Sequence, residues 1–106
     1  MASVISAERT IREAIAARAP LALRYDGERG PHRTVHPQVL FRSASGQLSV
    51  DCYQVAGPSS SGKPLPGWRD FDLAKIDGIA LAAGSFRPAP GLNLAARKYA
   101  QVLAHV

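Results

Sequence analysis

The first apolar positions of the chain recur with the spacing of a helix. In residues 6–18, SAERTIREAIAAR, Ile11 and Ile15 lie four positions apart, and Ala14 lies beside them on the same face. Pro20 follows closely, and the residue before a proline disfavours helical backbone geometry. We therefore expect one amphipathic helix over residues 6–18.

After Pro20 the apolar positions alternate with polar ones, which is typical of strands with one buried face. Clusters of Gly, Ser, Pro and Asp separate the alternating segments, as expected of turns. The segments predicted as strands are 21–25, 33–42, 47–55, 68–76 and 77–86. Pro37 indicates a break or an edge position inside the second of these, because proline cannot donate a ladder hydrogen bond. A turn at Asp77-Gly78 separates the last two.

A second stripe of helical spacing ends the chain. In residues 92–106, LNLAARKYAQVLAHV, apolar side chains at Leu92, Tyr99 and Val106 recur on one face. We predict a C-terminal helix over about residues 93–104.

The order of helix, strands and helix defines the expected fold class. Residues 1–106 are predicted to form a single domain, mainly β with flanking helices, with its strands over about residues 21–86. Short strands around one core favour a small β-barrel or a strongly bent antiparallel sheet, because closing a sheet removes its exposed edges.

Charge adds a candidate partner to this picture. The chain carries 13 Lys and Arg against 8 Asp and Glu, a net charge of +5. A basic surface attracts phosphates and nucleic acid, because binding releases counterions. The alternative is a domain whose surplus arginines are simply solvated.

Cysteine content and the first residues bear on the compartment. Cys52 is the single cysteine, so the chain has no internal disulfide, and we expect a reducing compartment such as the cytoplasm. The N-terminal residues lack the apolar run of a signal peptide or a membrane span, so no membrane partner is predicted.

The stretch GPSSSGKP, residues 57–64, has the glycine and lysine spacing of a phosphate-binding P-loop. A P-loop enters a helix and places Ser or Thr after the lysine to bind magnesium. Here Pro64 follows Lys63, and the next segment alternates like a strand. We therefore predict a connecting loop rather than a nucleotide-hydrolysing site.

Candidate catalytic residues are few. Cys52 lies in an apolar alternation, which is typical of a small buried side chain. The three histidines, His32, His36 and His105, show no triad spacing, and two histidines on one strand are a weak zinc signal. We expect no catalytic residue, no metal site and no cofactor.

Two arginines begin predicted strands beside apolar residues. Arg33 and Arg69 must be paired or bind a ligand if they are buried. The acids available for pairing are Asp51, Asp70 and Asp72. Trp68 is either a stacking platform or a lid on the core, and the lid is favoured because buried area dominates tryptophan energetics.

Four segments, in this order, resemble the WYL domain family. They are TIREAIAARAPLALRYDG, RTVHPQVLF, GQLSVDCYQV and WRDFDLAKIDGIAL, followed by Phe86. The resemblance covers about residues 10–90. Arg33 matches the family arginine before a proline, Arg69 matches the arginine before a phenylalanine, and Lys75 replaces a further arginine. The name-giving Trp-Tyr-Leu aligns with Leu48-Ser49-Val50, so a serine replaces the family tyrosine.

The resemblance implies an Sm-like small β-barrel and a non-enzymatic regulatory module, as found mostly in bacterial transcription regulators. Such a module senses a ligand or binds nucleic acid through basic and aromatic residues on one face. The implied partner is single-stranded nucleic acid or a nucleotide-like ligand. The residues expected to line the groove are Arg33, Arg69, Lys75, Ser49, Tyr53 and Trp68.

A protein–protein interaction module is the alternative function. In that hypothesis the predicted terminal helix supplies the contact, with its apolar stripe and the basic pair Arg97-Lys98. The module then forms homo-oligomers or docks on a partner regulatory protein.

Overall fold

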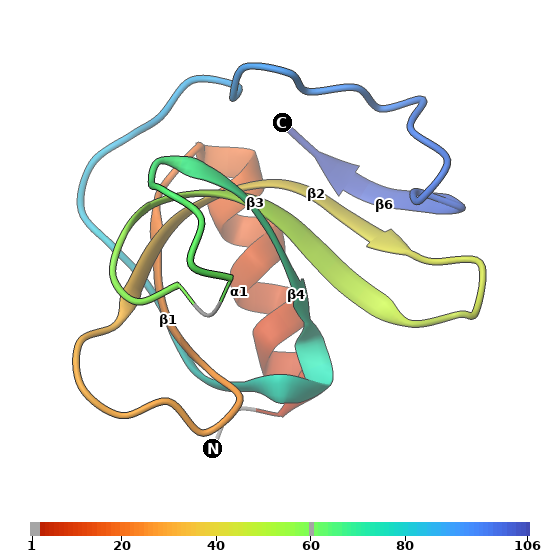
Figure 1. Ribbon diagram of the computed structural model, residues 1–106. Coiled ribbons are helices and arrows are strands. Elements are labelled where there is room, and N and C mark those ends of the chain that lie inside the picture. The colour runs from red at the N-terminus through yellow and green to blue at the C-terminus, as the bar shows by residue number, and fades with distance from the viewer. Residues whose placement is uncertain (1–2, 60) are drawn as a thin grey trace.

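The computed structural model describes residues 3–59 and 61–106, which form a mainly β structure with one N-terminal helix (Figure 1). In chain order the elements are α1 (Val4–Ala17), β1 (Leu21–Tyr25), β2 (Arg33–Arg42), β3 (Leu48–Ala56), β4 (Gly67–Asp72), the 3₁₀ turn η1 (Leu73–Lys75), β5 (Ile76–Leu81) and β6 (Gln101–His105). The predicted first helix and first three strands are confirmed within two or so residues at each end, the usual uncertainty of element boundaries.

All six strands belong to one antiparallel sheet with the order β4-β3-β2-β1-β5, and β6 pairs with β2. The sheet is bent, with β2 and β3 curving across the molecule (Figure 1). Within the described residues no pairing joins β4 to β5, so the predicted barrel is not closed. The structure confirms the alternative, a bent antiparallel sheet. β4 and β5 follow each other in the chain but lie at opposite edges of this sheet.

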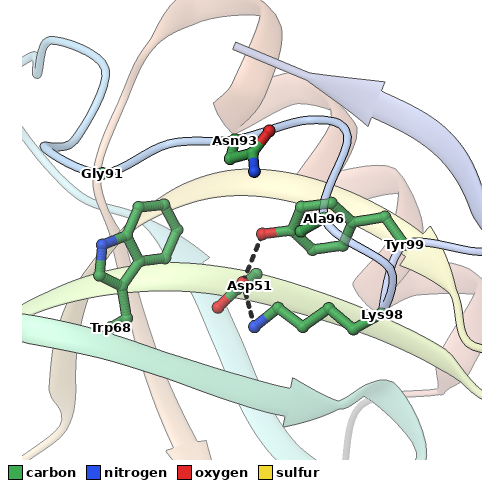
Figure 2. A pocket seen from close by; sticks show the side chains of 7 residues that line it. All are labelled: Asp51, Trp68, Gly91, Asn93, Ala96, Lys98 and Tyr99. Carbon is green, nitrogen blue, oxygen red and sulfur yellow. Dashed lines mark hydrogen bonds and ion pairs between the residues drawn. The ribbon is translucent and has the colours of Figure 1, made fainter.

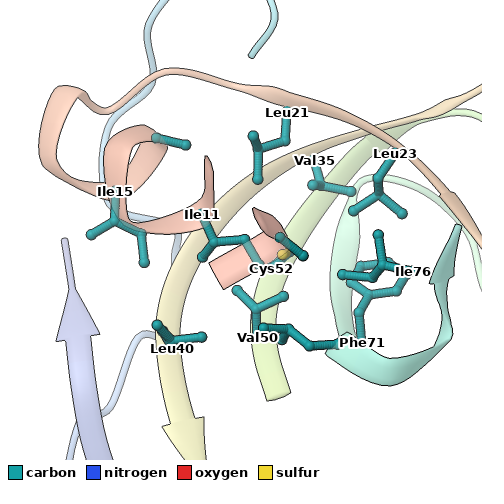
Figure 3. Close-up of a cluster of buried hydrophobic side chains, with 13 residues drawn as sticks. Ile11, Ile15, Leu21, Leu23, Val35, Leu40, Val50, Cys52, Phe71 and Ile76 are labelled. Carbon is teal, nitrogen blue, oxygen red and sulfur yellow. The ribbon is translucent and has the colours of Figure 1, made fainter. Parts of the chain in front are cut away.

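One face of α1 covers the core of this sheet. Ala7, Ile11, Ala14 and Ile15 are buried, and the helix packs against β2, β5, β6 and η1. Figure 3 shows the core around them, whose other members come from the inward positions of β1 to β5 and from η1. None of the described helices is long and apolar enough to cross a membrane.

The segment 68–76, predicted as one strand, is divided by a 3₁₀ turn. β4 ends at Asp72, whose carboxylate accepts the Ala74 N–H at 3.0 Å and so begins η1. The predicted turn at Asp77-Gly78 is wrong, because both residues lie inside β5. An aspartate side chain that satisfies its own local backbone competes with the strand ladder, and this moves the turn four residues towards the N-terminus.

The C-terminal helix predicted over 93–104 is wrong. Residues 87–100 form turns and irregular structure, and we call them the covering segment because they pass over the outer face of β3 and β4. Gln101–His105 then form β6, which pairs with the second half of β2. An isolated helix of this length is marginal in water, whereas pairing satisfies an exposed strand edge.

β2 changes partner along its length. Its first residues pair with β1 through Val35, and from Val39 onwards the same edge pairs with β6. Gln38 lies between these two stretches, at an irregularity of the β2–β3 pairing, and is fully buried. Its side-chain oxygen accepts the Ala89 N–H at 2.9 Å, and its backbone carbonyl accepts the Val106 N–H at 3.0 Å. One residue therefore holds both ends of the C-terminal portion.

Replacement of Gln38 by leucine tests this anchor. The substitution removes the acceptor of a buried N–H, so we expect Gln38→Leu to lower the free energy of unfolding by about 1–3 kcal/mol. Urea denaturation measures the effect, with the exposed Gln101→Leu as the matched control. Equal stability of the two variants would contradict the anchoring role.

Candidate ligand pocket

A pocket of about 200 Å³ lies between the outer face of the sheet and the covering segment (Figure 2). Two strand residues and five residues of the covering segment line it: Asp51, Trp68, Gly91, Asn93, Ala96, Lys98 and Tyr99. We call it the Asp51 pocket. Strand alternation positions its floor, because Val50 and Cys52 face the core and Asp51 between them faces outward.

Asp51 is the buried charged group of the pocket, with 1% of its surface exposed. Its Oδ2 accepts a hydrogen bond from the Tyr99 hydroxyl at 2.6 Å and lies 2.6 Å from the Lys98 ammonium. Lys98 Nζ also lies 3.2 Å from Asp70, the residue opposite Asp51 on β4. The second oxygen of Asp51, Oδ1, is buried without a hydrogen-bond partner among the described residues. Two carboxylates thus share one ammonium.

The electrostatics of the cluster follow from this shortage of positive charge. Burial and the neighbouring Asp70 raise the pKa of Asp51 to about 6, although Lys98 and Tyr99 act in the opposite direction. Burial and the hydrogen bond to Asp51 raise the pKa of Tyr99. Burial opposes the charge on Lys98, but Asp51 and Asp70 outweigh it and raise the pKa of the lysine. The phenol and the ammonium therefore stay protonated at neutral pH, whereas Asp51 has a pKa of about 6.

Trp68 stands at one side of the pocket, at the start of β4 (Figure 2). Its indole N–H donates to the carbonyl of Pro90 at 2.9 Å, which ties the ring to the covering segment. Tyr53 packs edge-on against the indole at a centroid distance of 6.1 Å, outside the pocket lining. Of the two aromatic residues predicted for a groove, Trp68 lines the pocket, and Tyr53 contacts the Trp68 ring without lining the pocket.

Arg33 is paired inside the protein. It is 2% exposed, and Glu28 accepts hydrogen bonds from its Nε at 2.9 Å and its Nη2 at 2.5 Å. Gln54 accepts a third from Nη1 at 3.1 Å, and the guanidinium lies 5.3 Å from the centre of the Phe71 ring. The expected acid partners on β3 and β4 are not used, since Glu28 comes from the turn before β2. Each guanidinium nitrogen is committed to an internal contact.

Arg69 organises the loop that contains the P-loop-like stretch. Its guanidinium donates to the Ser59 hydroxyl at 3.0 Å and to the carbonyls of Trp68 and Lys63 at 2.7 and 3.0 Å. The loop enters β4 and not a helix, as the prediction of a plain connecting loop requires. Arg69 therefore holds the loop against the start of β4.

The remaining two predicted residues lie apart from the pocket lining. Ser49 is 3% exposed and accepts a hydrogen bond from the Gln47 side chain at 2.9 Å. Lys75 is exposed in η1. Among the six predicted residues, Trp68 lines the Asp51 pocket, whereas Arg33 lines a separate pocket beside Tyr25 and Glu28.

The residues that sequence reasoning missed belong to the covering segment. The predicted helix includes Asn93, Lys98 and Tyr99, and the sequence offers Asp51 only as a pairing partner for the arginines. The alternation of β3 correctly predicts that Asp51 faces away from the core, but no local signal shows that another segment covers this face. Within residues 3–59 and 61–106, no group of three or more His, Cys, Asp or Glu side chains is placed to hold a metal ion.

Comparison with known proteins identifies a shared fold. No family model and no curated protein matches the chain. The solved structure of proteasome accessory factor B/C (PafBC) of Arthrobacter aurescens is similar, with a TM-score of 0.62 and 22% sequence identity. The match covers 82% of this chain and 13% of that chain, so the likeness concerns one small part of a much longer protein. At this identity the likeness concerns the fold alone, and it is consistent with the WYL-like fold expected from the sequence.

Replacement of Arg33 distinguishes a structural arginine from a surface cation. Arg33→Ala breaks a buried ion pair, so we expect a loss of about 3 kcal/mol in the free energy of unfolding. The exposed Lys75→Ala is the control and should change stability by less than about 0.5 kcal/mol. Chemical denaturation of both variants checks this, and an equally small change for Arg33→Ala would contradict the structural role.

The raised pKa of Asp51 predicts how stability depends on pH. The folded protein keeps a proton on Asp51 up to about pH 6, whereas the unfolded chain releases it near 3.8. Stability from this group is therefore present at low pH and is lost as the pH rises from about 4 to about 6, on the order of 2–3 kcal/mol. Urea denaturation at several pH values should show this fall in the wild type and its absence in Asp51→Asn. Parallel pH profiles would contradict the assignment.

Proposed function

We propose that this chain is a non-enzymatic regulatory module of the WYL type that senses a small ligand in the Asp51 pocket. The fold shared with PafBC, a WYL-domain-containing regulator, supports the regulatory class. The site itself supports ligand binding through one observation: Asp51 lines a pocket between two parts of the protein, and one of its carboxylate oxygens is buried without a hydrogen-bond partner among the described residues. An unmet buried acceptor costs about 1–3 kcal/mol, which a ligand donor recovers.

The composition of the pocket favours binding over catalysis. Cys52, the candidate nucleophile, is buried on the opposite face of β3, and burial raises the pKa of its thiol. Asp51 and Tyr99 hold each other through a hydrogen bond, and an activated nucleophile is not part of this set. The proposal therefore contains no reaction step.

The covering segment gives the pocket a route to regulation. Trp68 and Asp51 belong to the sheet, whereas Lys98 and Tyr99 belong to the segment that continues into β6. A ligand between them contacts both parts at once, so binding changes how firmly the segment is held. A ligand can shift such an equilibrium only by its differential affinity for the two arrangements.

Nucleic acid is the second candidate ligand, and the net charge of +5 favours it. The arginines first expected to carry this function are engaged internally, so the exposed cations are the remaining contacts. Those whose side chains make no hydrogen bond or ion pair among the described residues are Arg9, Arg18, Arg29, Lys63, Lys75, Arg87 and Arg97. Binding of this kind would take place outside the Asp51 pocket and would weaken as salt increases.

Filling the pocket tests the proposed function. We expect members of a fragment library of small polar aromatic and amine compounds to shift the amide signals of Asp51, Trp68 and Tyr99 in ¹H–¹⁵N spectra. Ala96→Leu places a larger side chain in the lining and should weaken such binding at least about tenfold, equivalent to about 1.4 kcal/mol. Ala95→Leu, an exposed neighbour outside the lining, is the matched control.

Two outcomes would contradict the proposal. One is a library without any pocket ligand, and the other is equal binding by the two leucine variants. A single-stranded oligonucleotide examined at low and high salt forms the second arm. Salt-sensitive oligonucleotide binding that Ala96→Leu leaves unchanged would favour the second candidate.

A further inference from the structure

The charges around the Asp51 pocket do not balance. Asp51 and Asp70 contribute two carboxylates from neighbouring strands, and Lys98 is the ammonium between them, 2.6 Å from the first and 3.2 Å from the second. Tyr99 contributes a neutral hydroxyl, and the residue of β2 opposite Asp51 is the apolar Val39. With both carboxylates ionised, the cluster carries one net negative charge in a protein whose total charge is +5.

The two oxygens of Asp51 are used unequally. Oδ2 has both Lys98 and Tyr99 as partners, which occupies its two lone pairs. Oδ1 has no hydrogen-bond partner among the described residues although it is buried. The missing group is therefore a hydrogen-bond donor, and one with a positive charge also completes the charge balance.

An aromatic wall stands beside this carboxylate. Trp68 lines the same pocket, and its hydrogen bond to Pro90 fixes how the indole is placed (Figure 2). A tryptophan beside a carboxylate suits an organic cation, because the ring attracts positive charge and the carboxylate accepts its N–H groups. The pocket suits an inorganic cation less well, since calcium takes six to eight oxygen ligands and magnesium about six.

On this basis we infer that the Asp51 pocket binds a small planar organic cation, with an amidinium or guanidinium group on Asp51 and its apolar part beside Trp68. This inference rests on the proposed function and specifies the ligand class of that pocket. The cavity of about 200 Å³ admits a single ring with one charged substituent. The surplus carboxylate of the pocket disfavours an anionic ligand, although the net charge of the protein alone suggests one.

Proton competition follows from this arrangement. The groups facing Asp51 are Asp70 from β4 and Lys98 and Tyr99 from the covering segment. Because the pKa of Asp51 is about 6, the proton and the cation compete for the same carboxylate. Affinity for the cation should therefore rise as the pH increases through this value.

Three compounds of nearly equal size and different charge test the inference on the wild-type protein. Benzamidine is a cation, benzamide is neutral and benzoate is an anion. We expect benzamidine to shift the signals of Asp51, Trp68 and Tyr99 and to bind at least about tenfold more tightly than benzamide, the ratio that about 1.4 kcal/mol gives. Benzoate should not bind there. Benzamidine binding should weaken several-fold between about pH 7.5 and about pH 5, where Asp51 is protonated.

The matched variants are Asp51→Asn and Asp26→Asn. Both remove one negative charge, but Asp26 is exposed in the turn after β1, away from the Asp51 pocket. We expect the first variant to lose benzamidine binding at least about tenfold and the second to keep it within about twofold, as for a distant surface charge.

The outcomes separate this inference from the proposed function. Equal or tighter binding of benzamide or benzoate at the same residues overturns the cation class and leaves the ligand pocket intact. Absence of binding by all three compounds, while other library fragments occupy the pocket, also overturns it. Absence of every ligand overturns both. Because the comparison of the three compounds uses the wild type, it stands even where Asp51→Asn folds poorly.

Discussion

The structure depends on how the backbone of β2 is satisfied where the strand changes partner. Pro37 has no N–H to donate, and the pairing of this edge passes from β1 to β6 beside it. Buried backbone groups need partners, and Gln38 supplies them by accepting the N–H groups of Ala89 and Val106. The chain from 89 to 106 thus begins and ends at one buried residue. That closure keeps the covering segment on the sheet and forms the Asp51 pocket beneath it.

Two buried charges show how differently this fold treats ionised groups. Arg33 has an internal partner at each guanidinium nitrogen, an arrangement that fixes the turn before β2 and the neighbouring strand. Asp51 has strong partners on one oxygen and none among the described residues on the other. A buried charge that is fully paired is sufficiently explained by folding, whereas one left partly unpaired in a cavity points to a ligand. The geometry, more than the residue type, distinguishes the two.

Much of the fold could be predicted from the sequence, because alternation and turn residues are local signals. The inward positions of β1, β2 and β3 follow directly from this alternation, as does the buried face of α1 around Ile11. The helix predicted over residues 93–104 is wrong because alanine, leucine and lysine have high helix propensity. The pairing of Gln101–His105 with β2 is not encoded in the local sequence. The pocket could not be predicted for the same reason, since three of its polar side chains lie in this segment. The pattern of β4 places Trp68 at the start of that strand, but no local signal indicates its hydrogen bond to Pro90.

The covering segment also determines where a signal would leave such a module. In the proposed function, the ligand lies between Trp68 on the sheet and Tyr99 on the segment, and β6 follows two residues after Tyr99. A cation on the free oxygen of Asp51 shares this carboxylate with Lys98, so occupancy acts directly on a contact that holds the segment in place. The pairing of β6 with β2 confines this change to the covering segment, because the hydrogen bonds of a strand pair open together. The response is therefore expected in residues 87–100 first, between the anchors at Gln38 and the edge of β2.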